Sequence, residues 1–285
     1  MKPHGSNMTD RELAIKAIVL RRRMLQLIFD AGAGHTGGGL SCLDILNVLY
    51  NRVLRVAPET VDDPLRDRYV QSKGHCVEAL YTVICDRGFF PDAALDTVCQ
   101  YQSHYVGHPT RKINGVEMNT GALGHGLPIC LGMALAGKMD AAPYRVFTLL
   151  GDGELAERSN WEAAMAGAHY RLDNLVAILD HNTLQITGHT REVMSNEPLD
   201  EKWRAFGWEV RTVDGHDYAQ LTAALSAPPA AGKPLFIIAN TVKGRGVSFM
   251  ENVGKWHHGV PGDAELAQAL AELDAAGREL LEATA

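Results

Sequence analysis

Residues 145–188 constrain the fold of this chain more than any other stretch; they read RVFTLLGDGELAERSNWEAAMAGAHYRLDNLVAILDHNTLQITG. A first apolar run ends in Gly151-Asp152-Gly153, a helical pattern follows, and a second apolar run, LVAILD, ends two residues before Asn182. The order strand, turn, helix, strand is that of a parallel sheet, in which both strands deliver their carboxyl ends to one edge. We therefore expect Asp152 and Asn182 to face a common ligand at that edge.

Apolar patterns on both sides of this stretch continue the alternation of strands and helices. Further strands are expected at residues 67–72, 209–213 and 235–242. Helices are expected at residues 10–31, from Ser41 onward, at 128–139, at 218–225 and after Asp263. Residues 101–128 show little regular pattern but several glycines and histidines, which is typical of a functional loop. The alternation predicts an α/β fold, a mostly parallel sheet with helices on both faces, as a single domain over residues 1–285.

Local signals place several helix starts. Thr9 and Glu12 form a capping-box pattern before the first helix, and Ser41 and Asp263 are expected to cap two later ones. The one stretch rich in basic residues, RRR at 21–23, lies inside the first helical pattern. We therefore expect these arginines to form a solvated helix face.

The composition excludes several classes of function. The 27 Lys and Arg against 34 Asp and Glu give a formal net charge of −7, which provides no basic field for nucleic acid. No apolar run approaches the roughly 18 residues of a membrane span, and the amino terminus has no apolar signal-peptide core. The five cysteines are scattered without metal-like or disulfide-like spacing, which suits a reducing compartment. We expect a cytoplasmic protein with no nucleic-acid or membrane partner.

The chemistry expected at the sheet edge is the binding of a metal and a diphosphate. Glycines beside Asp152 let phosphate oxygens and a cation approach the backbone, and the following helix offers free amides. Mg²⁺ prefers about six oxygen ligands, and Asp152, Asn182 and the carbonyl of Leu184 fit three of those positions. Alone, Gly-Asp-Gly is usually only a turn, and Asn182 could be a left-handed turn residue. Their joint placement is more specific, because a complete helix-strand unit of 28 residues separates Gly153 from Asn182.

The chain resembles the amino-terminal, thiamine-diphosphate-binding domain of transketolases. The 151–188 stretch is similar to the family's thiamine-diphosphate motif, and further matching segments run in order through some 240 residues: AGAGHTGGGLSCLDIL, RYVQSKGHC, YVGHP, MNTGALGHG, FGWEV-RTVDGHD and NTVKGRGVSFMEN. The resemblance implies thiamine diphosphate with Mg²⁺ or Ca²⁺ as cofactors. It also implies that metal ligands come from Asp152, Asn182 and Leu184.

The same resemblance implies roles for other residues. Cofactor contacts would come from His75, Gly121, Leu123, Gly124, Gly151, Asp152, Gly153, Glu154, Asn182 and His257. The substrate channel, with its proton traffic, would be lined by His35, His75, His108 and His257. Glu157 would join a hydrogen-bond relay between paired active sites. Two points stay open: His258 is adjacent to His257 and could replace it, and Lys243 could make either a loop-ordering salt bridge or a phosphate contact.

The family's pyrimidine-binding and carboxyl-terminal domains have no counterpart in this sequence. The resemblance thus implies the amino-terminal subunit of a split transketolase, working with a partner chain that carries the pyrimidine-binding domain, as a heterotetramer. The pair would transfer a two-carbon ketol unit between sugar phosphates, with unusual sugars such as apulose phosphate among the candidates. Arg158 stands where the family commonly has glycine, and His125 where glutamine is frequent, so the Glu157 relay and substrate choice are affected.

Two other functions remain alternatives. The thiamine-diphosphate-binding subunit of a 2-oxo acid dehydrogenase shares the Asp-to-Asn metal motif and a two-chain arrangement, but would not explain the histidines at 35, 75 and 108 together with KGRGVSFMEN. A catalytically idle thiamine-diphosphate-binding module that regulates a partner is the other alternative. The intact metal and histidine set argues against it, whereas Arg158 keeps it open.

Overall fold

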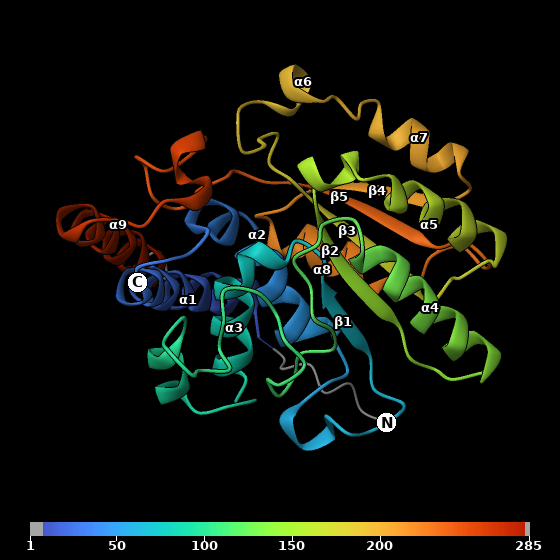
Figure 1. The fold of residues 1–285 in the computed structure, drawn as a ribbon, viewed down its shortest axis with the longest axis horizontal. Helices are drawn as coiled ribbons and strands as arrows, with labels where there is room; N and C mark the ends of the chain where they lie inside the picture. The colour runs from blue at the N-terminus through green and yellow to red at the C-terminus, as the bar shows by residue number, and fades with distance from the viewer. Residues whose placement is uncertain (1–7, 283–285) are drawn as a thin grey trace.

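Five parallel strands form the centre of the molecule, in the order β1-β2-β3-β5-β4. The structure is a computed structural model that describes residues 8–282 (Figure 1). The strands are β1 (Arg68–Gln71), β2 (Val146–Gly151), β3 (Leu175–His181), β4 (Glu209–Asp214) and β5 (Leu235–Asn240). The predicted α/β fold class is confirmed, and the structure adds the strand order, which the sequence pattern did not provide.

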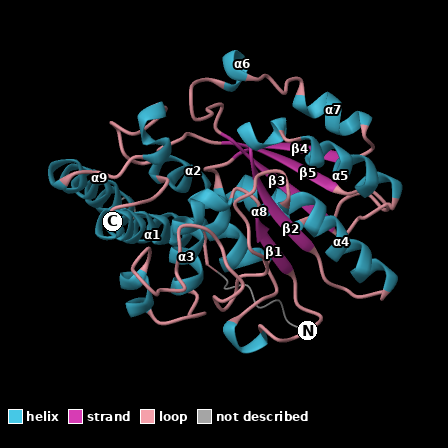
Figure 2. Cartoon of the chain, viewed as in Figure 1, coloured by secondary structure: helices cyan, strands magenta, loops and turns pink. Residues whose placement is uncertain are grey.

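Helices cover both faces of this sheet (Figure 2). They are α1 (Asp10–Ala31), α2 (Thr36–Val48), α3 (Val77–Asp86), α4 (Gly126–Met139), α5 (Arg158–His169), α6 (Thr190–Val193), α7 (Leu199–Ala205), α8 (Tyr218–Ser226) and α9 (Asp263–Glu282). One face packs on α4, α5 and α7, and the other on α2 and α8, with α1, α3 and α9 beyond them (Figure 1). Strands β1, β2, β3 and β5 are therefore buried on both faces, whereas the edge strand β4 is partly exposed.

The central strand β3 shows why its sequence is apolar throughout. Val176 and Ile178 join the core on the α2 side, whereas Ala177 and Leu179 join the core on the α4 side. Successive side chains of a strand point to opposite faces, so a strand covered on both sides needs apolar residues at every position. The polar residues that matter for function therefore lie at the strand ends.

The carboxyl ends of four strands come together at one edge. Register pairs Gly151 of β2 with Asp180 of β3, and His181 of β3 with Asn240 of β5. The first residue after β2, Asp152, consequently lies beside the end of β3. The loops after β1 and β5 reach the same edge, which brings four separate segments of chain to one place.

The second helix begins earlier than its sequence indicates. α2 starts at Thr36, so the prediction that Ser41 caps it is wrong. The three glycines at 37–39 lie inside the helix, where an added Cβ would come within 2.7–2.9 Å of Trp256, Cys76 or Met24. Close packing with neighbouring segments therefore stabilises a helical turn that glycine disfavours by itself.

Other local predictions need smaller corrections. Thr9 caps α1 through the predicted capping box. Asp263 is the first residue of α9 rather than its cap, and Glu265 accepts the amide of Gly262 there. The helix expected from residue 128 begins at Gly126, and β5 ends two residues before the expected limit.

The expectation of a solvated arginine face at residues 21–23 is wrong for Arg21. Its side chain is buried and binds Asp44 of α2 through both carboxylate oxygens, at 2.6 and 3.1 Å. The same carboxylate contacts His216 and Tyr218. Neighbouring side chains on a helix point in different directions, and this one faces α2 instead of water.

No helix among residues 8–282 has both the length and the apolar character needed to cross a membrane.

Candidate active site

A cavity of about 440 Å³ opens at the carboxyl edge of the sheet. Its wall includes most of the residues predicted from the sequence: His35, His75, Gly121, Leu123, Gly151, Asp152, Gly153, Glu154, Asn182, Leu184 and His257. It also includes residues that no sequence signal had selected: Gly38, Lys73, Gln185, Ile186 and Thr187. Segments that are far apart in the sequence thus meet around one cavity.

Asp152 and Asn182 form one corner of this cavity, as the parallel topology predicted. Both residues are 4% exposed, which leaves them open only toward the cavity. Asp152 accepts the backbone amides of Gly153, at 2.9 Å, and Thr183, while Asn182 Oδ1 accepts the amide of Leu184 at 3.2 Å. These bonds hold both oxygen-bearing groups in place before any ligand arrives.

The donor chemistry at this corner suits a hard divalent cation. One carboxylate, one amide oxygen and a backbone carbonyl are the ligand types that Mg²⁺ and Ca²⁺ prefer. Burial raises the pKa of Asp152 to about 6, and the nearby charge of Asp180 acts in the same direction. A bound cation would oppose both effects. The described residues contain no cluster of three His, Cys, Asp or Glu side chains at metal-binding distance, which agrees with the single-carboxylate set.

A fully buried ion pair lies directly beneath this corner. Lys73, which follows β1, pairs with Asp180 at the end of β3, with side-chain exposures of 2% and 0%. Asp180 also accepts hydrogen bonds from Ser41 Oγ at 2.6 Å, from Thr241 Oγ1 and from Asn182 Nδ2 at 3.3 Å. Asn182 is therefore oriented by Asp180. Sequence reasoning missed this pair, although an aspartate closing the apolar LVAILD run was a visible signal.

Glu154 joins the glycine-rich loop to the sheet edge. Its Oε1 accepts Ser72 Oγ and the amide of Gly124 at 2.9 Å, and its Oε2 accepts the amide of Gly151 at 3.0 Å. Burial raises the pKa of this carboxyl, while these donors lower it. Glu154 thus fixes the loop that brings Gly121 and Leu123 to the cavity wall.

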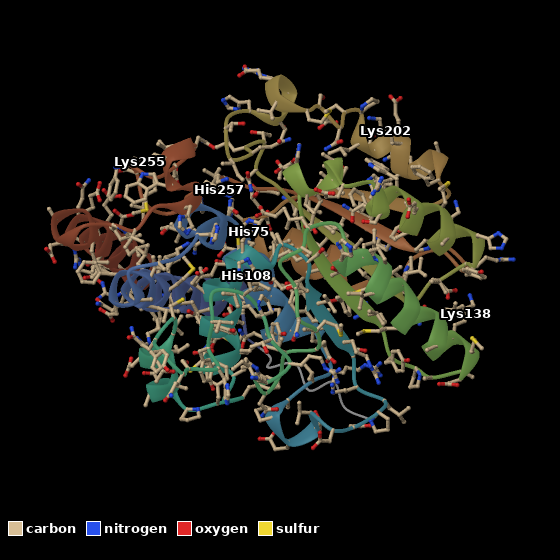
Figure 3. All side chains as sticks on the ribbon, viewed as in Figure 1. His75, His108, Lys138, Lys202, Lys255 and His257 are labelled. Carbon is tan, nitrogen blue, oxygen red and sulfur yellow. The ribbon has the colours of Figure 1, made fainter. Side chains whose placement is uncertain are left out.

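Histidines form the opposite wall. The ring of His35 lies 5.0 Å from that of His75, 5.5 Å from His257, 4.6 Å from His258 and 6.5 Å from His108, centroid to centroid. Figure 3 shows His75, His108 and His257 close together near the middle of the molecule. Consecutive members of the set His35, His75, His108 and His257 are 33 to 149 positions apart in the chain, so the sequence alone could not show that the rings meet.

Burial keeps the rings of His35, His108 and His257 neutral near pH 7. It lowers the pKa of His35 to about 4 and that of His257 to about 3, with neighbouring Lys243 adding to the effect on His257. The pKa of His108 is lowered as well, for the same main reason. Neutral imidazoles each offer one donor and one acceptor, which suits hydrogen bonding to hydroxyl groups.

Lys243 has its ammonium group at the cavity wall. The residue is 2% exposed, and Nζ lies 2.8 Å from Nδ1 of His257. In its charged form Lys243 has only donors, so Nδ1 accepts and the proton of His257 sits on Nε2. Among the described residues Lys243 forms no salt bridge with a carboxylate. Of the two rings in question, His257 lines the cavity, while His258 is not part of its wall and contacts His35 from another side.

Three predicted site residues lie outside the cavity wall. His108 packs on Gly121, where an added Cβ would come 2.6 Å from its ring, and Gly124 lies beside the Cβ of Glu157. Glu157 itself is exposed at the start of α5 and next to Arg158, which is exposed too. The ring of His125 is 3.0 Å from the carbonyl of Leu123. Neither Glu157 nor Arg158 is therefore part of the cavity wall.

Asp152 and Asn182 line a cavity at the carboxyl edge of a parallel α/β sheet, which is where proteins of this class bind their ligands. The profile of the "transketolase, thiamine diphosphate binding domain" matches residues 11–279. One subunit of the apulose-4-phosphate transketolase of Phocaeicola vulgatus is 48% identical over 254 residues, covering 89% of this chain and 90% of that protein. The chain belongs to the transketolase family, as the resemblance predicted.

Other relatives extend this comparison. The 6-deoxy-6-sulfo-D-fructose transketolase subunit SqwG of Clostridium sp. is 41% identical over 268 residues, covering 93% of this chain and 98% of its own length. Human transketolase is 40% identical over 239 residues, 84% of this chain but 38% of that protein. The solved Leishmania mexicana transketolase superposes with a TM-score of 0.83 at 25% identity, over 96% of this chain and 45% of that chain. The chain thus spans less than half of these longer transketolases.

Proposed function

We propose that this chain is the diphosphate-binding subunit of a two-chain transketolase, which transfers a two-carbon ketol unit from a ketose phosphate to an aldose acceptor. The observation that carries the proposal is the cavity, which has metal-type oxygen donors on one wall and neutral imidazoles on the other. Two relatives that are named as subunits of an apulose-4-phosphate transketolase match this chain over 90% and 99% of their own lengths, which supports a two-chain enzyme.

In this proposal the oxygen-bearing corner holds the tail of thiamine diphosphate. Asp152, Asn182 and the carbonyl of Leu184 would bind Mg²⁺ or Ca²⁺ together with the diphosphate, which would lie against the backbone of Gly153 at the cavity wall. The ammonium of Lys243 would face the same negative charge. The cofactor, when bound, supplies the electron sink for cleavage of a carbon-carbon bond. The chain's own contribution is charge neutralisation and positioning.

The imidazole wall would receive the sugar. Because the lowered pKa values keep His35 and His257 neutral, each ring can accept a hydrogen bond on one nitrogen and donate on the other. His257 carries its proton on Nε2, so it would donate to a sugar oxygen. His75 and His108 would complete the set that orients hydroxyl groups and moves protons.

The remaining parts of the proposal concern the assembly. We infer a partner chain that carries the pyrimidine-binding domain and completes the site, a heterotetramer of two such pairs, and a cytoplasmic location. Glu157, next to the loop of Gly124, would connect the paired sites in this assembly. The partner chain is supported by the named subunits among the relatives, and the connecting role of Glu157 by its position outside the cavity.

The test is reconstitution with the partner chain. The purified pair should transfer a two-carbon unit from at least one ketose phosphate to an aldehyde acceptor, with activity that depends on thiamine diphosphate and on Mg²⁺ or Ca²⁺. A pair that binds the cofactor but transfers no ketol unit would support a regulatory module instead. Decarboxylation of a 2-oxo acid without ketol transfer would assign the chain to the dehydrogenase class.

A further inference from the structure

Helix α3 lies directly behind the imidazole wall and carries two buried polar side chains one turn apart. Glu78 is 1% exposed and Tyr81 is fully buried. Neither residue lines the cavity, so neither would touch a ligand held there. Each lies against the backbone segment that carries a different site histidine.

Glu78 meets the loop that carries His35. A Cβ added to Gly34 would lie 3.1 Å from Glu78 Oε1 and 2.8 Å from Ile28, so the loop passes this carboxyl at a distance only glycine allows. The backbone amides of Glu78 itself and of His35 act on this carboxyl and lower its pKa, but burial outweighs them. Its other oxygen, Oε2, is buried and has no partner among the described residues.

Tyr81 anchors the second histidine segment. Its hydroxyl donates to the backbone carbonyls of Val106 and His108, each at 3.2 Å. The segment around His108 is irregular, so this phenol is one of the contacts that fix its distance from α3. The ring of His108 then packs against Gly121.

We propose that Glu78 and Tyr81 are positioning residues, which hold the backbones of His35 and His108 on one rigid helix and so set the separation of their rings. That separation is 6.5 Å between centroids. The inference rests on the proposed function, because it treats both histidines as sugar-binding groups. It adds two residues outside the cavity that determine where those groups stand.

Burial also determines the protonation state in which Glu78 meets the His35 loop. Burial raises its pKa to about 8, so near pH 7 the carboxyl is largely protonated. Titratable groups around it are Cys76 on the preceding turn, Tyr81 on α3 and Cys99 on the loop after residue 97. Nothing among them supplies a positive charge, and His35 itself remains neutral. Ionisation of Glu78 above pH 8 would therefore place an unpaired charge against the His35 loop.

The first experiment measures ketol transfer by the reconstituted pair with conservative and truncating variants. Glu78→Ala removes the carboxyl that packs against the His35 loop at Gly34, and we expect KM for the ketose phosphate to rise roughly tenfold with a smaller loss of kcat. Glu78→Gln, uncharged and of the same shape, should restore KM to within about twofold at pH 7. Tyr81→Phe should raise KM severalfold through His108. Matched controls are Glu279→Ala and Tyr170→Phe, which change exposed residues.

The second experiment uses pH and does not depend on activity. The carboxyl of Glu78 ionises near 4.5 when unfolded and near 8 when folded, so the folded chain holds an extra proton between these values and loses stability as pH rises. The melting temperature of the wild-type chain should fall relative to Glu78→Gln between pH 5 and 8, by on the order of 5 °C. In the reconstituted pair, KM of the wild type should rise above pH 8, and that of Glu78→Gln should not.

Several results would overturn the proposal. These are unchanged KM and kcat in Glu78→Ala, or superimposable pH profiles of wild type and Glu78→Gln. If Glu78→Ala does not fold, the Gln and Phe variants still decide the question. Failure of the wild-type pair to transfer any ketol unit would refute the proposed function, whereas the pH dependence of the melting temperature would still test the contact of Glu78 with the His35 loop.

Discussion

Replacement of Lys73 by methionine should destabilise the chain by about 3 kcal/mol. Removing one member of a buried ion pair typically costs about 3–5 kcal/mol, because the other charge stays behind without a partner. Asp180 retains three neutral donors, from Ser41, Thr241 and Asn182, which places the expected cost at the lower end. Methionine keeps the buried methylenes, so little packing energy is lost.

The loss is measurable by thermal unfolding of the full-length chain. At about 2 °C per kcal/mol for a chain of this size, Lys73→Met should lower the melting temperature by about 6 °C. Lys138→Met is the matched control, because Lys138 pairs with Asp173 at side-chain exposures of 39% and 41%. Such an exposed pair is worth about 0–1 kcal/mol, so this variant should lose about 2 °C or less.

Two further measurements identify the cause of the loss. In Lys73→Met/Asp180→Asn no charge is left unpaired, so the double variant should lose less stability than the sum of the two single variants. Burial lowers the pKa of Lys73, but the attraction of Asp180 outweighs it and raises that pKa above its ordinary value of 10.5. The stabilisation is therefore complete below 10.5 and is lost only as pH rises through the folded pKa. The loss in Lys73→Met should be equal at about pH 6 and about pH 9. A melting temperature within about 2 °C of wild type, or additive losses, would refute the reasoning.

Three other predictions follow from single contacts. Asp152→Ala should keep its fold but weaken metal-dependent binding of thiamine diphosphate at least about tenfold, as measured by calorimetry with and without Mg²⁺; unchanged affinity would remove Asp152 from the ligand set. Gly126→Ala should lower the melting temperature, because the new methyl group would lie 2.3 Å from Ser72. Gly132→Ala is the control and should raise the melting temperature slightly, because nothing lies within 4 Å of the new methyl group and alanine favours the helix. Equal effects of the two substitutions would contradict this reasoning. The lowered pKa of His35 means that stability is lost as pH falls from 6.5 toward 4, so His35→Gln should flatten the pH dependence of the melting temperature in that window, and an unaltered slope would argue against it.

The sequence was informative where structure depends on neighbouring residues. The strand-turn-helix-strand unit around Asp152 could be predicted because two apolar runs and a helical pattern follow one another without interruption. The approach of Asp152 to Asn182 could be predicted as well, since parallel strands share a carboxyl edge. The order of the elements and their parallel topology were enough for both predictions.

The sequence was misleading where distant segments decide the structure. Ser41 looks like a helix cap, but the glycines before it are helical because they pack against Met24, Cys76 and Trp256. Arg21 looks solvated, but its partner Asp44 lies on another helix. The local sequence pattern shows neither the close packing of these glycines against distant residues nor the partner of Arg21.

The two buried aspartates at the sheet edge, Asp152 and Asp180, differ in whether the chain itself supplies a positive charge to them. Asp180 is neutralised by Lys73 and accepts three further hydrogen bonds, so its charge is compensated within the chain. Asp152 lies close to it, forms no ion pair with Lys or Arg among the described residues, and has its pKa raised to about 6 by burial and by that neighbour. A buried carboxylate without a counter-charge is costly, and a second lysine or an arginine beside Asp152 would have removed that cost. The pattern therefore supports the proposed cation at Asp152, which lines the cavity, rather than at Asp180, which does not.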